Sequence, residues 1–140
     1  GAEPLVGWSQ KSDVLAALDS DSRIFDARTT GEHDGSAPKD AAPGDPRTGH
    51  MPGAVNIPHA SLLDERGRLR PAAEIREMLL AAGFRPGDRI TTHCHGGARA
   101  SLSALAALYA GFGPVSNYYM SFSEWAADEQ CPVEGGRPAP

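Results

Sequence analysis

The stretch His93-Cys94-His95-Gly96-Gly97-Ala98-Arg99 decides how the rest of the chain is interpreted. A short β-branched run, Ile90-Thr91-Thr92, stands before it and favours an extended strand. After it, apolar side chains recur at the spacing of one helix face: Leu102, Leu105, Ala106 and Tyr109. The pattern therefore predicts a cysteine at the end of a strand, a tight loop, and a helix that begins at or near Arg99.

A loop of this kind favours a nucleophilic cysteine. Gly96 and Gly97 let the backbone curl tightly, because glycine adopts angles that other residues avoid. A curled loop points its N–H groups inward as an anion-binding nest, and the start of a helix adds unpaired N–H groups. Both favour the thiolate of Cys94, which is the nucleophilic form. Arg99 adds a permanent positive charge and a fork of donors for an anionic substrate.

Three further stretches carry a resemblance to one family. Phe25-Asp26-Ala27-Arg28 is followed by Glu32, then comes Gly49-His50-Met51-Pro52-Gly53-Ala54, and a closing segment runs from Tyr118 to Trp125. In this order, and with the cysteine loop, they resemble the rhodanese family of sulfurtransferases, with Met51 in place of isoleucine. The similarity spans residues 8 to 133. It implies the three-layer α/β rhodanese-like fold, in which helices flank a mainly parallel central sheet.

The remaining sequence fits that architecture, since strands alternating with helices indicate a parallel sheet. Strands are predicted over 23–26, 54–57 and 115–118, and one helix is predicted to start after Ser9 or Ser12. Pro71 opens another helix, and Ser121 or Ser123 caps a short last one. The buried face predicted for the helix after Pro71 consists of Ile75, Met78, Leu79 and Ala82.

Residues 34–48 form the most irregular stretch, with three prolines and two glycines. Loops of this length are often either functional or idle in solvent. If this loop overhangs a catalytic pocket, Arg47 faces the substrate. The sequence leaves both possibilities open.

Composition limits the class of protein. A length of 140 residues predicts a single domain over 1–140, with a core at about 8–133 and a flexible tail over 134–140. The net charge of −5 argues against nucleic acid as a partner. No apolar run approaches the roughly 20 residues of a membrane helix, and no secretory signal opens the chain. The expectation is a cytoplasmic protein without a membrane partner. The sequence does not determine its oligomeric state.

The resemblance implies a transferase that uses Cys94 covalently. The Cys94 thiolate takes a sulfane sulfur from a thiosulfate-like anionic donor and carries it as a persulfide to cyanide or a thiol. Cys94 and Arg99 are the expected catalytic residues. The expected substrate-binding residues are Arg28, His95, Gly96, Gly97 and Ala98. His95 bears on the choice of donor, and no metal or organic cofactor is implied.

Two other functions compete. His93-Cys94 followed by a glycine-rich loop and an arginine is similar to the signature of cysteine phosphatases and arsenate reductases. Only four residues separate Cys94 from Arg99, however, one fewer than that loop needs, and position 100 is alanine. The other alternative is a sulfur carrier or partner-binding module that keeps the cysteine but turns over little.

Several cysteines and histidines have structural interpretations. His50 and His59 lack the spacing of metal ligands. His93 and Cys94 point to opposite faces of a strand, so they cannot easily share an ion. Cys131 is interpreted as a structural or surface thiol, with a resolving thiol for Cys94 as the alternative. Asp26, Arg28 and Glu32 are interpreted as an ion-pair and turn network.

Overall fold

A parallel sheet forms the centre of the molecule in the computed structural model, which describes residues 6–37 and 47–135. Across these residues the sheet has five strands in the order β1-β5-β4-β2-β3. Their bounds are Gly7–Ser9 for β1, Arg23–Asp26 for β2, Val55–Asn56 for β3, Ile90–His93 for β4 and Val115–Tyr118 for β5. All neighbouring strands pair in parallel, which confirms the predicted architecture.

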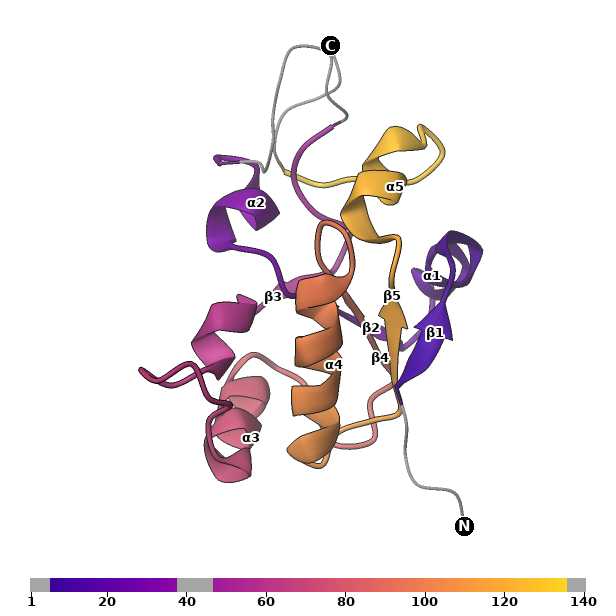
Figure 1. Ribbon diagram of the computed structural model, residues 1–140. Helices are drawn as coiled ribbons and strands as arrows, with labels where there is room; N and C mark the ends of the chain where they lie inside the picture. Colours follow the sequence, from indigo (N-terminus) through magenta and orange to yellow (C-terminus); the bar gives the residue numbers. More distant parts are fainter. Residues whose placement is uncertain (1–5, 38–46, 136–140) are drawn as a thin grey trace.

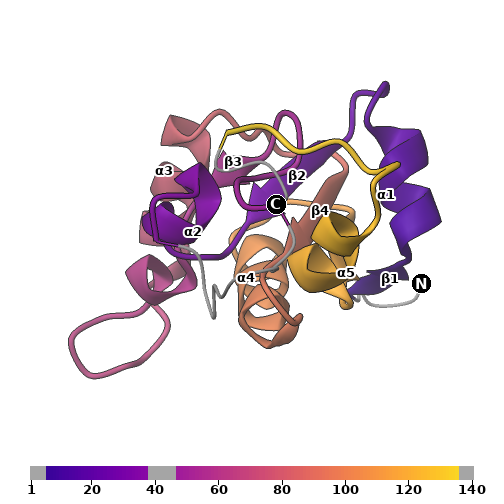
Figure 2. The same cartoon turned by 90° about the horizontal axis from the view of Figure 1, so that it is seen from above.

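Helices cover both faces of this sheet (Figure 1; Figure 2). They are α1 (Lys11–Ala17), α2 (Thr30–Asp34), the 3-10 turn η1 (His59–Leu62), α3 (Ala72–Ala81), α4 (Ala98–Tyr109) and α5 (Ser121–Ala127). Successive strand residues point to opposite faces. Phe25 accordingly packs in the hydrophobic cluster formed with α3 and α4, whereas Ile24 packs in the cluster formed with α1 and α5. The result is three layers.

The buried face of α4 differs from the prediction. Leu105 and Tyr109 are 57% and 56% exposed, and Leu102 is only half-buried. The residues that face the sheet are small: Ala100, Ser103, Ala104, Ala106 and Ala107. Small side chains let the helix axis approach the sheet closely, so the large apolar residues turn outward. In α3 the predicted Ile75 and Leu79 are fully buried, while Met78 and Ala82 are half-buried.

The predicted helix caps are wrong at both ends of the chain. Gln10, not Ser9 or Ser12, is the N-cap of α1, and the Asp13 carboxylate accepts a hydrogen bond from its N–H at 2.8 Å. The Ser9 hydroxyl instead bonds the Ser116 hydroxyl at 2.6 Å, between β1 and β5. The N-cap of α5 is Met120, whose side chain makes no capping hydrogen bond, and Ser121 is the first helical residue.

The two threonines of the central strand β4 find hydrogen-bond partners inside the protein. The Thr92 hydroxyl donates to the Ala100 carbonyl of α4 at 3.1 Å, and Thr91 bonds the Ser116 hydroxyl at 3.2 Å. A buried hydroxyl without a partner would destabilise the fold by about 1–3 kcal/mol. These bonds explain how a strand with two threonines lies at the middle of the sheet and anchors α4 to it.

Within the described ranges, no helix has the length and apolar content to cross a membrane.

Candidate active site

The candidate site lies at the carboxyl end of β4, between β4 and β2. From β2 the chain continues to β3 on one side, and from β4 it continues to β5 on the other side. The loops therefore diverge between these two strands, which is where parallel α/β sheets bind ligands. Cys94 follows β4 directly and is 1% exposed. The structure thus places the predicted nucleophile at the point where the topology favours a site.

The sulfur of Cys94 accepts a hydrogen bond from the loop. The Gly97 N–H donates to Cys94 Sγ at 2.9 Å. Gly97 is the N-cap of α4 and has a φ of +96°, in the left-handed region that favours glycine. A Cβ on Gly97 would also collide with the backbone oxygen of Tyr119 and with its ring, whereas a Cβ on Gly96 would meet nothing within 4 Å. Only one of the two glycines is therefore required sterically.

The segment after β5 holds the backbone of the loop. The Cys94 N–H donates to Ser121 Oγ at 3.1 Å, and Ser121 Oγ donates to the Tyr118 carbonyl at 2.8 Å. The N–H groups of Phe122 and Ser123 donate to the carbonyls of Cys94 and His95 at 3.0 and 3.2 Å. Sequence reasoning missed Ser121 as a residue of the site and treated it as a possible helix cap.

Arg99 forms a bidentate ion pair with Glu32. The two guanidinium N–H groups donate to Glu32 Oε1 and Oε2 at 2.7 and 2.8 Å. Burial opposes ionisation of Glu32, but the bonds from Arg99 and Thr29 outweigh it and lower the pKa of this carboxyl. Glu32 in turn raises the pKa of Arg99, and Cys94 contributes in the same direction. The arginine is therefore oriented by a carboxylate on α2, a partner that the sequence did not specify.

Arg28 is buried, and its guanidinium has partners inside the protein. Its guanidinium donates to both Asp26 oxygens and, at 2.6 Å, to the Gly49 carbonyl. It also lies 4.1 Å from the centre of the Phe122 ring. Of the predicted ion-pair network, Asp26 and Arg28 do pair, whereas Glu32 pairs with Arg99 instead. Contact between Arg28 and substrate stays a prediction.

Asp26 is the centre of a buried polar cluster. His33 Nδ1 lies 2.8 Å from Asp26 Oδ2, and His93 Nε2 lies 3.8 Å from Asp26 Oδ1. Burial opposes ionisation of Asp26, but His93, His33 and Arg28 outweigh it and hold its pKa well below the usual range. Burial lowers the pKa of His93 despite the attraction of Asp26. Within the part of the chain described, His93 Nε2 has no hydrogen-bond partner.

Acid should destabilise the domain through His93. Because its pKa is lowered in the folded state, the unfolded chain binds more protons below about pH 6.5. The free energy of unfolding should therefore decrease as the pH is lowered, by at most about 1.4 kcal/mol per pH unit for one group. His93→Asn should flatten that dependence in urea unfolding between about pH 7.5 and 5. If the free energy of unfolding depends on pH equally in both proteins, His93 is not the group responsible.

The other histidines have varied surroundings. His50 Nδ1 hydrogen bonds the His33 carbonyl at 2.8 Å, and the two rings stack with centroids 4.0 Å apart. His59 is half-buried, and burial followed by the charge of Arg99 lowers its pKa. His95 is half-buried on the loop. In the described ranges, no three His, Cys, Asp or Glu side chains group as metal ligands would.

The irregular stretch over 34–48 is only partly described, since residues 38–46 lie outside the described residues. At its end, Arg47 donates to the carbonyls of Asp128 and Cys131 at 2.8 and 2.7 Å. Arg47 therefore ties this stretch to the segment after α5. Whether the loop overhangs the site stays a prediction.

Cys131 lies in the hydrophobic cluster between the sheet and α5, whereas Cys94 belongs to the cluster on the α3 and α4 side. Both are free thiols, and burial raises the pKa of Cys131. Cys131→Ser should leave the reactivity of Cys94 unchanged but lower the free energy of unfolding by about 1–3 kcal/mol, because it buries a hydroxyl. Cys131→Ala, which adds no polar group, is the control. A large loss of rate in both variants would support a resolving thiol.

The family model of the rhodanese-like domain matches residues 10–128. The chain belongs to the rhodanese-like domain family. Its curated relatives include the thiosulfate sulfurtransferases of Pseudomonas aeruginosa and Azotobacter vinelandii. They are 33% and 36% identical over 115 residues, covering 82% of this chain and 41% of each relative. This rhodanese-like domain therefore spans about two fifths of the length of these relatives.

A solved structure supports the fold. The anaerobic ergothioneine biosynthesis enzyme of Chlorobium limicola, in complex with trimethyl histidine, matches with a TM-score of 0.79 and 25% identity. The match covers 93% of this rhodanese-like domain and 32% of that enzyme.

Proposed function

We propose that this domain is a sulfurtransferase in which Cys94 accepts a sulfane sulfur from an anionic, thiosulfate-like donor. The observation that carries the proposal is the position of Cys94 Sγ at the start of α4, 2.9 Å from the Gly97 N–H that donates to it. This donor favours negative charge on sulfur. The names of the curated relatives, thiosulfate sulfurtransferase, support the same activity.

The reaction proceeds in two half-reactions. The Cys94 thiolate attacks the outer sulfur of thiosulfate, a sulfur–sulfur bond forms, and sulfite leaves with the electron pair of the bond that breaks. Cyanide or a thiolate then attacks the outer sulfur of the persulfide and takes it, which returns the Cys94 thiolate. Such covalent catalysis gives ping-pong kinetics. The N–H of Gly97, which donates to Cys94 Sγ in the structure, would stabilise the anionic persulfide.

The short loop argues for sulfur over phosphate. Four residues separate Cys94 from Arg99, one fewer than in the loop of the cysteine phosphatases. A shorter loop forms a smaller cradle, with fewer N–H groups to surround a phosphoryl group bound to the cysteine. The loop is better suited to one sulfur atom.

A second candidate function is a sulfur carrier or partner-binding domain with little turnover of small donors. The burial of Cys94 favours it, since the thiol is 1% exposed and a free donor must reach it through the loop. Both functions use the same persulfide. They differ in how fast thiosulfate loads it.

Intact mass spectrometry tests the proposal. After mixing with thiosulfate and removal of the donor, the protein should gain the mass of one sulfur atom, and a reductant should remove it. Absence of the added mass under fast and prolonged mixing would overturn the sulfurtransferase assignment. If thiosulfate converts all of the protein to the Cys94 persulfide, but much more slowly than a transferase turns over, the result would favour the sulfur carrier.

Arg99→Lys should lower kcat/KM for thiosulfate by about tenfold or more, equivalent to roughly 1.4 kcal/mol of transition-state stabilisation. Lysine keeps the charge but loses the planar fork that engages both oxygens of Glu32. Glu32→Gln should cause a similar loss, and the double variant should lose less than the sum. Steady-state kinetics with thiosulfate and cyanide measure this, with the exposed Arg66→Lys as the control. Additive losses would contradict a shared role.

A further inference from the structure

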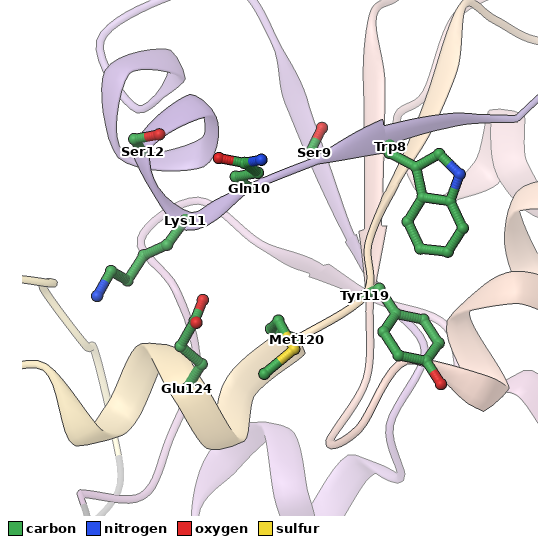
Figure 3. Close-up of a pocket in the computed structure, with 8 residues that line it drawn as sticks. All are labelled: Trp8, Ser9, Gln10, Lys11, Ser12, Tyr119, Met120 and Glu124. Atoms are coloured by element: carbon green, nitrogen blue, oxygen red, sulfur yellow. The ribbon is translucent and has the colours of Figure 1, made fainter.

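A hollow lies beside the candidate active site, where β1 passes into α1 and β5 passes into α5 (Figure 3). Its volume is about 640 Å³, which suits a small molecule. Tyr119 forms part of its wall and also packs against Gly97 of the cysteine loop. The sulfur chemistry proposed above does not use this hollow.

Two aromatic rings make a corner on one side of the hollow. Trp8 is 74% exposed although tryptophan is usually well covered, and it stands on the edge strand β1. The Trp8 and Tyr119 rings lie 5.4 Å apart with an angle of 63° between their planes. Met120, also exposed, lines the wall beside them. Open aromatic faces set at an angle attract organic cations through the ring quadrupoles.

The polar wall adds a negative charge. Glu124 lines the hollow, and one of its carboxylate oxygens accepts the Tyr118 hydroxyl at 2.6 Å. Lys11 also lines the hollow, but its ammonium is bound to Asp128 at 2.7 Å. Figure 3 shows the Lys11 side chain pointing away from the two rings. Asp128 raises the pKa of Lys11, and the Glu124 carboxylate, which also attracts this ammonium, contributes in the same direction. The two carboxylates together exceed the single positive charge of Lys11, so this wall is net negative.

We propose that this hollow binds a small organic ammonium ion, with the cation against the Trp8 and Tyr119 rings and attracted by the net negative charge of the wall that Glu124 belongs to. An anion would meet that excess negative charge and the negative faces of both rings. A purely apolar ligand would fill the aromatic corner but leave the excess charge of the wall uncompensated. The ligand class thus follows from the chemistry of the walls and is independent of sulfur transfer.

Calorimetric titration with choline and with its uncharged carbon isostere, dimethylbutanol, tests the proposal. Choline should bind saturably, and the isostere about threefold to fivefold more weakly, because it lacks the cation–π attraction. Trp8→Leu should weaken choline binding by about the same factor. Since Trp8 is largely exposed, this variant is not expected to disturb the fold.

Tyr109→Leu provides the matched control, because Tyr109 is an exposed aromatic residue on α4 that does not line the hollow. It should bind choline as the unaltered protein does. Equal affinities for choline and its isostere, or unchanged affinity in Trp8→Leu, overturn the proposal. The measurement involves no turnover, so its outcome does not depend on whether Cys94 transfers sulfur.

Discussion

Cys94→Ser is expected to reduce sulfur transfer to background, a loss on the order of a thousandfold or more. The serine hydroxyl occupies nearly the same volume and can accept the Gly97 N–H that now reaches Cys94 Sγ. The loop should therefore keep its shape. A hydroxyl is a far weaker nucleophile than a thiolate at neutral pH, and it cannot form a persulfide. Steady-state assays and intact mass should both report the loss.

The control for this variant is a measurement of its stability, which shows whether the fold is retained. Urea unfolding should give a similar midpoint and slope for both proteins, since the serine hydroxyl keeps the Gly97 N–H as a partner and the backbone bonds to Ser121 and Phe122 are unchanged. Substantial turnover by the Cys94→Ser protein would show that another group accepts the sulfur. The assignment of Cys94 would then be wrong.

Gly97→Ala should have the second largest effect on activity, because the added methyl group is unfavourable for two independent reasons. The φ of +96° is strained for any residue with a Cβ, and that Cβ would collide with Tyr119. Strain of this kind amounts to about 1–3 kcal/mol, and relief requires the loop to move. A displaced loop would misplace Cys94 Sγ, so kcat/KM for thiosulfate should fall on the order of a hundredfold.

Gly96→Ala is the matched control for this effect. The neighbouring glycine has open space where its Cβ would stand, so alanine there should change stability and rate little. The comparison uses thermal unfolding for stability and steady-state kinetics for rate. Equal behaviour of the two alanine variants would contradict the steric argument and show that the loop accommodates a side chain at either position.

The sequence predicted those parts of the fold that depend on short-range patterns. The strands over 23–26 and 115–118 have the predicted bounds, because β-branched and aromatic residues favour extended backbone. The apolar face predicted for α4 was right only in part: Ala106 is buried, but spacing identifies apolar positions and not how near the helix lies to the sheet. Leu105 and Tyr109 have the right period and still face outward.

For the site, the sequence specified the loop but not its supports. Gly97 could be expected to curl the chain toward Cys94, since both lie within one turn. The pairing of Arg99 with Glu32 joins residues 67 positions apart, and the bond between Cys94 and Ser121 depends on α5 lying over the loop. Such contacts follow from the packing of three layers. No local pattern encodes them.

The hydrogen bond from Cys94 to Ser121 also has a consequence for biosynthesis. Its acceptor lies 27 residues downstream of the cysteine. At a translation rate of roughly 5–20 residues per second, Cys94 waits about one to five seconds before Ser121 is made. During that interval the backbone of the cysteine loop lacks its bonds to Ser121, Phe122 and Ser123. The loop on which the proposed activity depends can therefore take its final shape only after this later segment has been made.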